Sequence, residues 1–281
     1  MTSATRSGRF PPVPDRKGPG RVLIIAGSDS GGGAGIQADI KTVTALGGYA
    51  ATAITALTAQ DTHTVHAIQE IPDAFIAQQI ALVADDIGAD CVKTGMLHRR
   101  SVIETVAAAL DAHLAGVPAV IDPVMVAKGG GRLLDDDTTG SLVSLLLPRA
   151  TLLTPNLPEA EVLTGMTITS VADMERAAEK LLAAGARAVL LKGGHLQGRE
   201  LTDLLLTRDG ERHVYSGQRI DTRHTHGTGC TMASAVACGI AQAMPLPDAV
   251  ARAREYVRKA ILTAPGLGSG HGPLNHGHTV G

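Results

Sequence analysis

The chain has 281 residues, of which 44% are hydrophobic but only 2% aromatic, and its formal net charge is −2. These residues suffice for a large aliphatic core, while the scarcity of aromatic rings and the scattered Lys and Arg argue against a nucleic-acid or membrane-surface partner. The cysteines Cys91, Cys230 and Cys238 form neither a disulfide framework nor a CxxC pair, which predicts a reducing, cytoplasmic compartment.

Residues 1–20 are polar and rich in Pro, Gly and basic side chains. They contain no apolar segment of the kind found in secretory signals, and we expect a disordered lead-in. No apolar run further along approaches the roughly 18 residues that a membrane helix needs. No linker divides the remainder, so residues 21–281 are predicted to form a single domain.

From residue 21 onward, predicted strands alternate with predicted helices. Short apolar or β-branched runs predict strands at residues 21–27, 49–60, 89–96, 118–125, 150–156 and 186–194. Apolar residues at helical spacing predict helices at residues 34–48, 72–88, 99–116, 133–148, 157–165 and 170–185. Strand–helix units with short connections indicate right-handed crossovers and therefore an α/β fold with a mostly parallel sheet.

The last third of the chain departs from this alternation. Two strand-like runs within residues 200–220 flank Asp209-Gly210, which predicts an antiparallel hairpin at one edge of the sheet. Helices are predicted from Thr231 to about Met244 and from about Pro247 to Leu262. The final residues are rich in Gly and His but lack the fixed spacing of a zinc motif, so we expect a solvated tail.

In open parallel sheets, ligands bind beyond the carboxyl ends of the strands, and the unusual loops of this chain all follow predicted strands. The first loop, AGSDSGGGAG at residues 26–35, indicates close approach of the backbone to a ligand. It lacks the GxGxxG spacing of a dinucleotide site and the GK[ST] ending of a Walker loop, which disfavours a Rossmann oxidoreductase. A plain flexible turn is the alternative interpretation.

Charged side chains follow three later strands. Asp122 ends one strand, Asn156 and Glu159 open the helix after the next, and Lys192 precedes two glycines. Carboxylates in this setting suit Mg²⁺ held together with substrate phosphates, and a lysine suits a phosphate. The alternatives are a turn residue for Asp122, compensation of the helix dipole for Glu159 and a solvated Lys192. Asp39, inside the first predicted helix, is equally compatible with an ordinary exposed acid.

The segment THGTGC at residues 225–230 leads into a predicted helix. Glycines at a helix N-terminus direct free backbone N–H groups and the positive end of the dipole at an anion, an arrangement that stabilises a transferring phosphoryl group. We expect Cys230 in this position to have a lowered pKa and more thiolate character. A small buried core residue is the alternative, and it describes Cys91 and Cys238 well.

Together these loops resemble the ribokinase superfamily and, more closely, the hydroxymethylpyrimidine/phosphomethylpyrimidine kinases of thiamine biosynthesis. The matching segments are AGSDSGGGAGIQADIKT, ITALTAQ, KTGML, DPVM-AK, LLTPNLPEA, VLLKGGH and HGTGCT. The resemblance implies a three-layer α/β/α fold and two successive phosphoryl transfers from ATP, first to the CH₂OH group of the pyrimidine and then to its monophosphate. It also implies a small-molecule substrate and a homodimer.

The resemblance further implies roles for individual residues. Asp39 and Gln60 would hydrogen-bond the aminopyrimidine edge, and Gly27, Met96 and Val124 would line its pocket.

Phosphate and metal binding are implied for a second group. Asp122 and Glu159 would hold Mg²⁺, and Lys192, Asn156 and Thr225 would contact the ATP phosphates.

The third group of residues with an implied role lies in the THGTGC segment. Gly227, Thr228 and Gly229 would form the anion hole, and Cys230 would occupy the position of the catalytic base. Most ribokinase-like sugar kinases carry Asp there, so Cys230 favours the pyrimidine or pyridoxal-like branch. The sequence departs from the family pattern at Thr58, in the lead-in and in the glycine-rich loop VMVAKGGG.

Two other functions remain open at this point. A pyridoxine/pyridoxal kinase has similar loops and a similar CH₂OH acceptor. A sensor that binds a pyrimidine phosphate without catalysis is disfavoured, because a binder has no need for both a phosphate cradle and a group that activates a nucleophile.

Overall fold

The computed structural model describes residues 18–125, 136–194, 196 and 198–280. Most of the expected lead-in and the glycine-rich loop VMVAKGGG from residue 126 onward lie outside the described residues. The strands are β1 Arg21–Asp29, β2 Tyr49–Gln60, β3 Val65–Glu70, β4 Cys91–Thr94, β5 Ala119–Ile121, β6 Leu152–Leu153, β7 Ala188–Leu191, β8 Glu200–Thr207 and β9 Arg212–Gln218. The helices are α1 Gly35–Ala45, α2 Asp73–Asp86, α3 Arg100–His113, α4 Asp136–Ser141, α5 Leu157–Thr164, α6 Val171–Ala183, α7 Thr228–Ala241 and α8 Leu246–Leu262.

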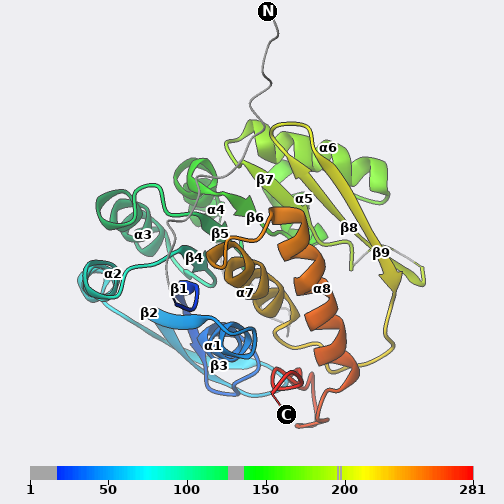
Figure 1. Ribbon diagram of the computed structural model, residues 1–281, viewed down its shortest axis with the longest axis horizontal. Helices are drawn as coiled ribbons and strands as arrows, with labels where there is room; N and C mark the ends of the chain where they lie inside the picture. The colour runs from blue at the N-terminus through cyan, green and yellow to red at the C-terminus, as the bar shows by residue number, and fades with distance from the viewer. Residues whose placement is uncertain (1–17, 126–135, 195, 197, 281) are drawn as a thin grey trace, which may run out of the picture.

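All described strands belong to one sheet of order β3-β2-β1-β4-β5-β6-β7-β8-β9 (Figure 1). The strands from β2 through β7 in this order pair in parallel. Antiparallel pairs close the sheet at both edges, β2 with β3 and β7–β8–β9 at the other side. The chain therefore has the mostly parallel sheet with an antiparallel edge hairpin that the sequence predicts.

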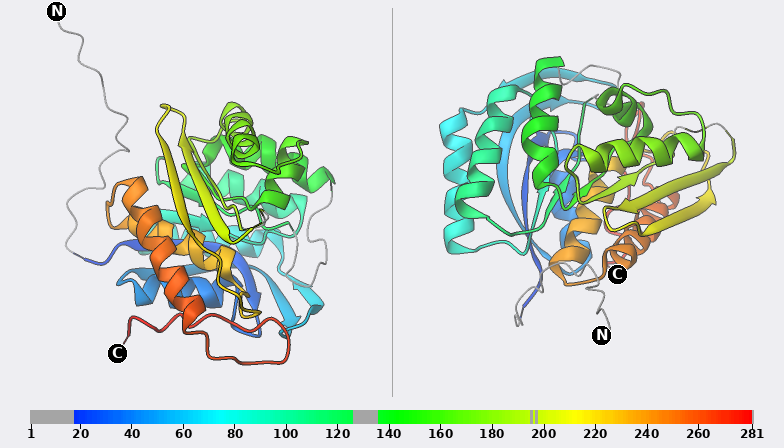
Figure 2. Two further views of the ribbon diagram at one scale, coloured as in Figure 1. Left: turned by 90° about the vertical axis from the view of Figure 1, so that its right-hand side faces the viewer. Right: turned by 90° about the horizontal axis from the view of Figure 1, so that it is seen from above.

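Helices cover both faces of the sheet, which gives three layers (Figure 2). Alternate residues of β1 enter different cores: Leu23 and Ile25 pack with α2 and α3, whereas Val22 and Ile24 pack with α7 and α8. Strands buried on both faces in this way read as continuous apolar runs, which is why they were recognisable from the sequence. The three-layer α/β/α prediction is confirmed.

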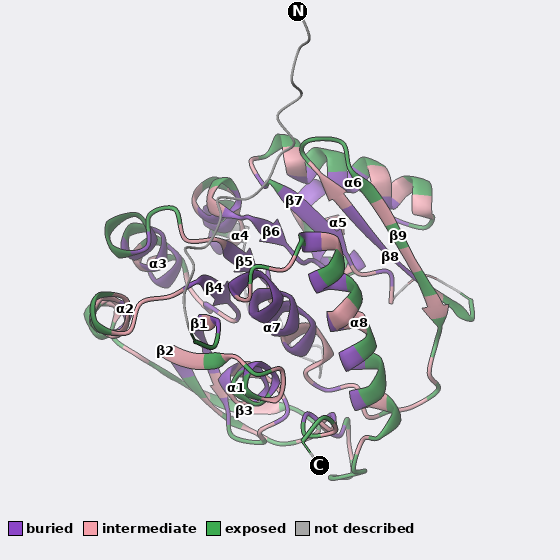
Figure 3. Cartoon of the chain, viewed as in Figure 1, coloured by how far each residue is buried: buried purple, intermediate pink, exposed green. Residues whose placement is uncertain are grey.

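Helix α7 lies in the middle of one of these faces. Every residue from Thr231 to Ala241 is buried, and in Figure 3 the helix is purple around its circumference. Its small side chains allow it to pack against α1, α8 and the sheet at once. The helix starts at Thr228, three residues earlier than predicted, because Gly227 adopts a left-handed conformation with φ of 82° and serves as its N-cap.

Two other features differ from the sequence-based expectation. Strand β3 was not predicted, because only Val65, Ala67 and Ile68 in this short edge strand are apolar and none of its residues is buried. The helix expected at residues 133–148 begins as α4 and continues as a π-helical turn over Leu142–Leu146. No helix within the described ranges is long and apolar enough to span a bilayer.

The C-terminal segment is solvated in part, as we expected: residues 265–269 are exposed, whereas residues 272, 274 and 276 are buried. His276 is 4% exposed and Leu274 3%. The hydroxyl of Tyr256 on α8 donates to the carbonyl of His276 at 2.6 Å, and Thr279 donates to the carbonyl of Ala45 at the end of α1. In Figure 1 this segment (red) lies beside the ends of α1 and α8. Its spacing does not predict a metal site, but its backbone and side chains have partners in the fold.

Candidate active site

The carboxylate of Asp29, at the end of β1, organises the first glycine loop. It accepts hydrogen bonds from the backbone N–H groups of Gly31, Gly33 and Ala34 at 2.8, 3.1 and 2.8 Å. Nε2 of His226 lies 2.8 Å from the same carboxylate. Burial would raise the pKa of Asp29, but the contacts with His226, Ala34 and Gly31 outweigh it and hold the pKa below its usual value. The loop is therefore held in one conformation around a charged carboxylate.

The first glycine loop touches the second one. A Cβ atom on Gly227 would lie 1.8 Å from the carbonyl oxygen of Gly33, so the two backbones approach more closely than any side chain would allow. Gly35 likewise faces the carbonyl of Gly27. The N-termini of α1 and α7 are thereby brought side by side.

The start of α7 is the segment that the sequence predicts to form an anion cradle. The carbonyl of Gly227 accepts hydrogen bonds from the backbone N–H of Thr231 at 2.9 Å and from its hydroxyl at 2.8 Å. The hydroxyl of Thr228 donates to the carbonyl of Thr225 at 2.7 Å. The N–H of Thr228 donates to the carbonyl of Thr225 at 3.3 Å. The N–H groups of Gly229 and Cys230 have no acceptor within the helix and can bind an anion at its N-terminus.

Cys230 is the third residue of α7 and is partly exposed. From the sequence, the pKa of the Cys230 thiol was expected to be lowered, and this prediction was wrong. Burial raises the pKa of the thiol to about 11, a shift that Lys93 opposes and Asp39 and Asp122 reinforce. Near neutral pH the side chain is therefore a thiol and not a thiolate. Cys91 and Cys238 are buried, as predicted.

Beneath Cys230 lies a buried ion pair. Both Asp39 oxygens accept hydrogen bonds from Nζ of Lys93, at 2.9 and 2.8 Å, and Oδ1 also accepts one from the hydroxyl of Ser234 at 2.7 Å. Ser234 is one turn beyond Cys230 on α7, so both face the same direction. Lys93 and Asp39 are fully buried. Asp39 is thus engaged within the protein, and its predicted contact with a pyrimidine remains a prediction.

Burial alone would lower the pKa of Lys93. The carboxylate of Asp39 outweighs it, together with Asp122, and keeps the pKa of Lys93 above its usual value. Burial raises the pKa of Asp39 in turn, against the effect of Lys93 and Ser234, and the short hydrogen bonds between the two side chains hold them together as a pair.

A second charged cluster contains Asp122, Lys192 and Glu159. Nζ of Lys192 donates to Oδ1 of Asp122 at 3.1 Å, and the hydroxyl of Thr154 donates to the same oxygen at 2.9 Å. A Cβ atom on Gly229 would lie 3.4 Å from Nζ of Lys192 and 3.8 Å from Oδ2 of Asp122. The cluster therefore faces the anion cradle directly, as the rule for strand ends predicted.

Glu159 forms a capping box with Asn156 at the start of α5. Its side chain accepts from the backbone N–H of Asn156 at 2.8 Å, and its own N–H donates to Oδ1 of Asn156 at 3.0 Å. Burial raises the pKa of Glu159 to about 7; Lys192 opposes this rise and Asp122 adds to it. The helix-capping alternative considered for Glu159 is therefore confirmed, and the backbone of Met125 also hydrogen-bonds the Glu159 carboxylate.

These carboxylates fit a magnesium ion shared with a substrate. No cluster of three or more His, Cys, Asp or Glu suited to a metal occurs within the described ranges. Mg²⁺ does not require one, because it is commonly held by one or two acids together with water and phosphate oxygens. Burial, reinforced by Asp122, raises the pKa of Glu159, and a divalent cation held there would favour its charged form.

The residues expected to line a pyrimidine pocket come from β1, β2 and the loops after β4 and β5. A Cβ atom on Gly27 would lie 2.6 Å from Cε of Met96, so glycine makes room for the Met96 side chain. Gln60 ends β2, and its Nε2 lies 3.4 Å from Nε2 of His226. Val124 is partly exposed and follows Asp122. Gln60 therefore lies next to His226, which donates from Nε2 to Asp29.

Sequence reasoning missed His226, Asp29 and Lys93. His226 belongs to the THGTGC segment and Asp29 to the first glycine loop. Both segments were predicted to form the site, but the contact between these two residues was not predicted. Lys93 was not predicted as a site residue, because its place in the apolar strand run ADCVKTGM does not indicate that it pairs with Asp39.

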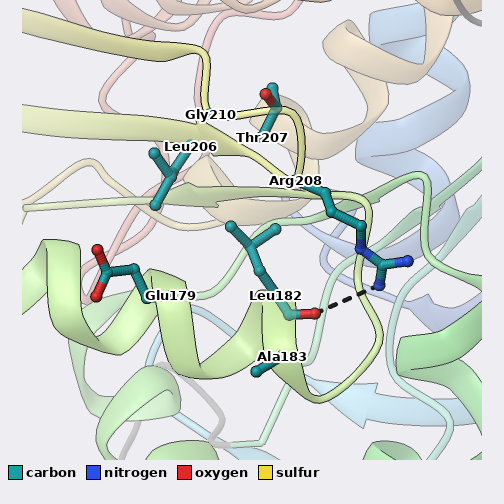
Figure 4. A pocket seen from close by; sticks show the side chains of 7 residues that line it. All are labelled: Glu179, Leu182, Ala183, Leu206, Thr207, Arg208 and Gly210. Atoms are coloured by element: carbon teal, nitrogen blue, oxygen red, sulfur yellow. Dashed lines mark hydrogen bonds between the residues drawn. The ribbon is translucent and has the colours of Figure 1, made fainter. Parts of the chain in front are cut away.

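A depression on the described surface lies away from the residues described above. It is formed by the end of α6 and the turn between β8 and β9 (Figure 4). Nη2 of Arg208 there donates to the carbonyls of Leu182, Gly185 and Ala186 at 3.3, 2.6 and 3.0 Å. Arg208 thus caps the C-terminus of α6, and the depression has a structural explanation.

A mostly parallel sheet, a glycine-led helix N-terminus and a facing lysine–carboxylate cluster define a ribokinase-like phosphotransferase. Residues 29–275 match the family model described as phosphomethylpyrimidine kinase, and the chain belongs to this family.

Relatives of this kind cover most of the chain. A hydroxymethylpyrimidine/phosphomethylpyrimidine kinase of Streptomyces coelicolor is 48% identical over 263 residues, which are 94% of this chain and 96% of that protein. A bifunctional thiamine-biosynthesis protein of Geobacter sulfurreducens is 51% identical over 258 residues. The match covers 92% of this chain but 52% of that protein, so the chain spans about half of its length.

Solved structures share the fold. A phosphomethylpyrimidine kinase from Clostridium difficile is 39% identical with a TM-score of 0.77, and the match covers 86% of this chain and 99% of that one. A pyridoxal kinase of Bacillus subtilis in complex with ADP is 36% identical with a TM-score of 0.84, covering 92% of this chain and 97% of that one.

Proposed function

We propose that the protein phosphorylates 4-amino-5-hydroxymethyl-2-methylpyrimidine with ATP and then phosphorylates the monophosphate to the diphosphate, for thiamine biosynthesis. The observation that supports this most is the anion cradle of α7 facing Lys192 and Asp122, in a chain of the phosphomethylpyrimidine kinase family. Oriented N–H groups and a cation stabilise the charge that spreads over a transferring phosphoryl group.

We assign the other residues the following roles. Gln60, Met96, Val124 and Gly27 hold the pyrimidine, with Asp39 as a further candidate, and Lys192, Asn156 and Thr225 contact the ATP phosphates. Asp122 and Glu159 would hold Mg²⁺, which would neutralise phosphate charge. Lys192 orients the phosphates as a point charge, and the backbone of Gly227, Thr228 and Gly229 receives the transferring group.

Cys230 acts as the base for the first acceptor. A primary alcohol benefits from proton removal, whereas the monophosphate is already anionic near neutral pH because its second pKa is about 6. We expect Cys230→Ala to reduce the first transfer far more than the second, measured as single-turnover rates with each acceptor. Equal losses in both transfers would contradict this role.

The high pKa of the thiol adds a pH dependence to this prediction. Because the pKa is raised to about 11, the thiolate fraction grows with pH throughout the working range. The kcat/KM of the first transfer should keep increasing beyond pH 9, and that of the second should not. A plateau of the first transfer below pH 8 would contradict a proton acceptor with this pKa.

A pyridoxal kinase is the second candidate, and the similarity to the Bacillus subtilis pyridoxal kinase is the observation in its favour. The assay that separates the two measures ATP consumption with the hydroxymethylpyrimidine, its phosphate and pyridoxal, with products identified by mass. Turnover of pyridoxal without turnover of either pyrimidine would overturn the main proposal. Binding of a pyrimidine phosphate without any product would favour the sensor.

Three further proposals concern the whole protein. Residues 21–281 act as one kinase domain after the lead-in. The protein is cytoplasmic, which its three unpaired cysteines favour. It forms a homodimer, to be tested by light scattering of the purified protein.

A further inference from the structure

We propose that His276, in the C-terminal segment, is a positioning residue for the anion cradle, which it fixes through Thr231 and the carbonyl of Gly227. This inference rests on the proposed phosphoryl transfer, because it assigns a task to the cradle. Its physical basis is a chain of buried hydrogen bonds that joins residues far apart in the sequence.

The direction of the hydrogen bonds follows from the groups involved. The carbonyl of Gly227 can only accept, so the hydroxyl of Thr231, 2.8 Å away, donates its single proton to it. Nε2 of His276 lies 3.0 Å from the same hydroxyl oxygen. With that proton in the hydrogen bond to Gly227, Nε2 of His276 donates to the hydroxyl oxygen. The neutral imidazole with its proton on Nε2 is the tautomer that completes the chain.

His276 remains neutral because of its surroundings. Burial, together with the nearby Lys41, His278 and His226, lowers the pKa of its imidazole to about 4, while the backbone of Leu274 opposes them. A neutral donor therefore persists through the physiological pH range. The neutral imidazole adds no charge to the cradle and affects it only by orienting the Thr231 hydroxyl.

The segment that carries His276 is anchored on two sides. On α8, the hydroxyl of Tyr256 donates to the carbonyl of His276 at 2.6 Å, and the N–H of Asn275 donates to the carbonyl of Ala260 at 3.0 Å. Beside the cradle, the N–H of His226 donates to the carbonyl of Gly272 at 3.2 Å, and His226 forms a parallel bridge with Pro273. The imidazole therefore reaches Thr231 from a fixed support.

The consequence concerns the geometry of the first turn of α7. Two donors from Thr231 hold the Gly227 carbonyl, and His276 prevents the Thr231 hydroxyl from rotating away. The peptide planes that follow, which carry the N–H groups of Gly229 and Cys230, are thereby set in direction. Donors aimed at the phosphoryl group without reorganisation contribute to the rate, so loosening them should reduce kcat more than nucleotide affinity.

The test compares His276→Gln with His276→Leu in the full chain. Gln retains an N–H donor near the position of Nε2, whereas Leu fills a similar volume and cannot donate. We expect His276→Leu to lower kcat of both transfers about tenfold, the equivalent of one hydrogen bond. ATP affinity, measured by calorimetry, should change less than threefold, and His276→Gln should keep kcat within about threefold of the wild type.

A double-mutant cycle with Thr231→Val provides the control for a structural effect. If His276 acts through the Thr231 hydroxyl, Thr231→Val should lower kcat as His276→Leu does, and the double variant should be no worse than either single one. Multiplicative losses would overturn the proposal. So would equal kcat for the folded fractions of His276→Leu and the wild type.

The tautomer is tested independently of activity. Long-range ¹H–¹⁵N spectra of the histidine rings should show His276 as the Nε2–H form from pH 6 to 8, in the wild type and in Cys230→Ala. An Nδ1–H form would contradict the hydrogen-bond chain even if both transfers occur. Conversely, a wild-type protein that transfers no phosphoryl group but shows the Nε2–H form would refute the proposed function and retain the hydrogen-bond chain.

Discussion

Lys93 and Asp39 illustrate how much a single buried charge depends on its partner. Each is fully buried, and each would be costly there alone, because removing an ion from water is expensive. The two hydrogen bonds between them and the third from Ser234 satisfy the carboxylate. A lysine within a strand run and an acid within a helix gave no indication of each other in the sequence.

This pairing predicts the effect of removing one charge. Lys93→Met leaves the carboxylate of Asp39 buried without a counter-ion, so we expect the free energy of unfolding to fall by about 3–5 kcal/mol in urea titrations. The double variant Lys93→Met/Asp39→Asn should recover most of this loss, because neither charge remains. A double variant as unstable as the single one would show that the pair is not the cause. The double variant also tests Asp39 as a pyrimidine ligand, since that role predicts a raised KM.

Glu159 gives a prediction for pH. Its pKa in the folded protein is raised to about 7 from an ordinary value of 4.5, so the folded state holds a proton that the unfolded state has released. The stabilisation is complete below pH 4.5 and is lost as the pH rises through 7. We expect the free energy of unfolding, compared with Glu159→Gln, to decline by up to about 3 kcal/mol between pH 4.5 and 7.5. A difference that does not vary with pH would contradict the shift.

Among the secondary-structure elements, the contact between the two glycine loops sets the geometry of the cradle. Gly227 combines a left-handed φ of 82° with an approach to Gly33 that excludes any side chain. Helix α7 can begin where it does only because both residues lack a Cβ atom. The same contact joins the N-terminal and C-terminal parts of the chain.

Gly227→Ala should therefore distort the cradle. We expect phosphoryl transfer to fall at least about 100-fold and the melting temperature to decrease, because the new methyl group meets the Gly33 carbonyl. Gly140→Ala is the matched control: it lies in α4, and a Cβ atom there would have no neighbour within 4 Å. That variant should keep full activity. Normal transfer by Gly227→Ala would show that the close approach is not needed.

At the level of elements, the sequence predicted most of what local chemistry determines. Asp209-Gly210 marked the β8–β9 hairpin, and Gly210 adopts a φ of 87° there. The buried parallel strands were predicted from their apolar runs. Strand β3 did not, because an edge strand that buries none of its residues has little apolar pattern to detect. The start of α7 was misplaced because a left-handed glycine can act as an N-cap without a side-chain hydrogen bond.

In the whole molecule, the two hydrophobic cores lie on opposite faces of one sheet. Ile25 belongs to the core with α2 and α3, and Ile24 to the core with α7 and α8, so adjacent residues of β1 connect them. Neither core is complete without the sheet. This arrangement favours cooperative unfolding of the described chain as one unit.

Variants in each core test this coupling. We expect calorimetry to show a single transition for the wild type, and Ile103→Ala on α3 and Val236→Ala on α7 should each lower its temperature without splitting it. Both side chains are fully buried, so each deletion leaves a cavity. A second transition in either variant would show that the faces unfold separately.

The location of the site was predictable from the whole fold, whereas its internal contacts were not. Parallel strands present their carboxyl ends at one edge of the sheet. From this rule, the sequence predicted that Asp122, Lys192 and the cradle lie close together. The contacts of His226 with Asp29 and of His276 with Thr231 join parts of the chain that follow no local pattern. The raised pKa of Cys230 likewise depends on enclosure by α1, β4 and α7, which a position at a helix N-terminus does not reveal.

The late position of α7 in the chain bears on how the protein is made. Ser234 meets Asp39 across 195 residues, and His226 meets Asp29 across 197. While the chain is being synthesised, β1 and β4 emerge long before the helix that covers them. Until α7 arrives, α1 can cover β1 and β2 on this face of the sheet, but the apolar side chains of β4 and β5 that pack against α7 remain uncovered. A nascent or truncated chain that ends before residue 228 therefore exposes apolar surface that can aggregate, and it lacks the cradle. We expect such fragments to bind chaperones and to have no residual activity.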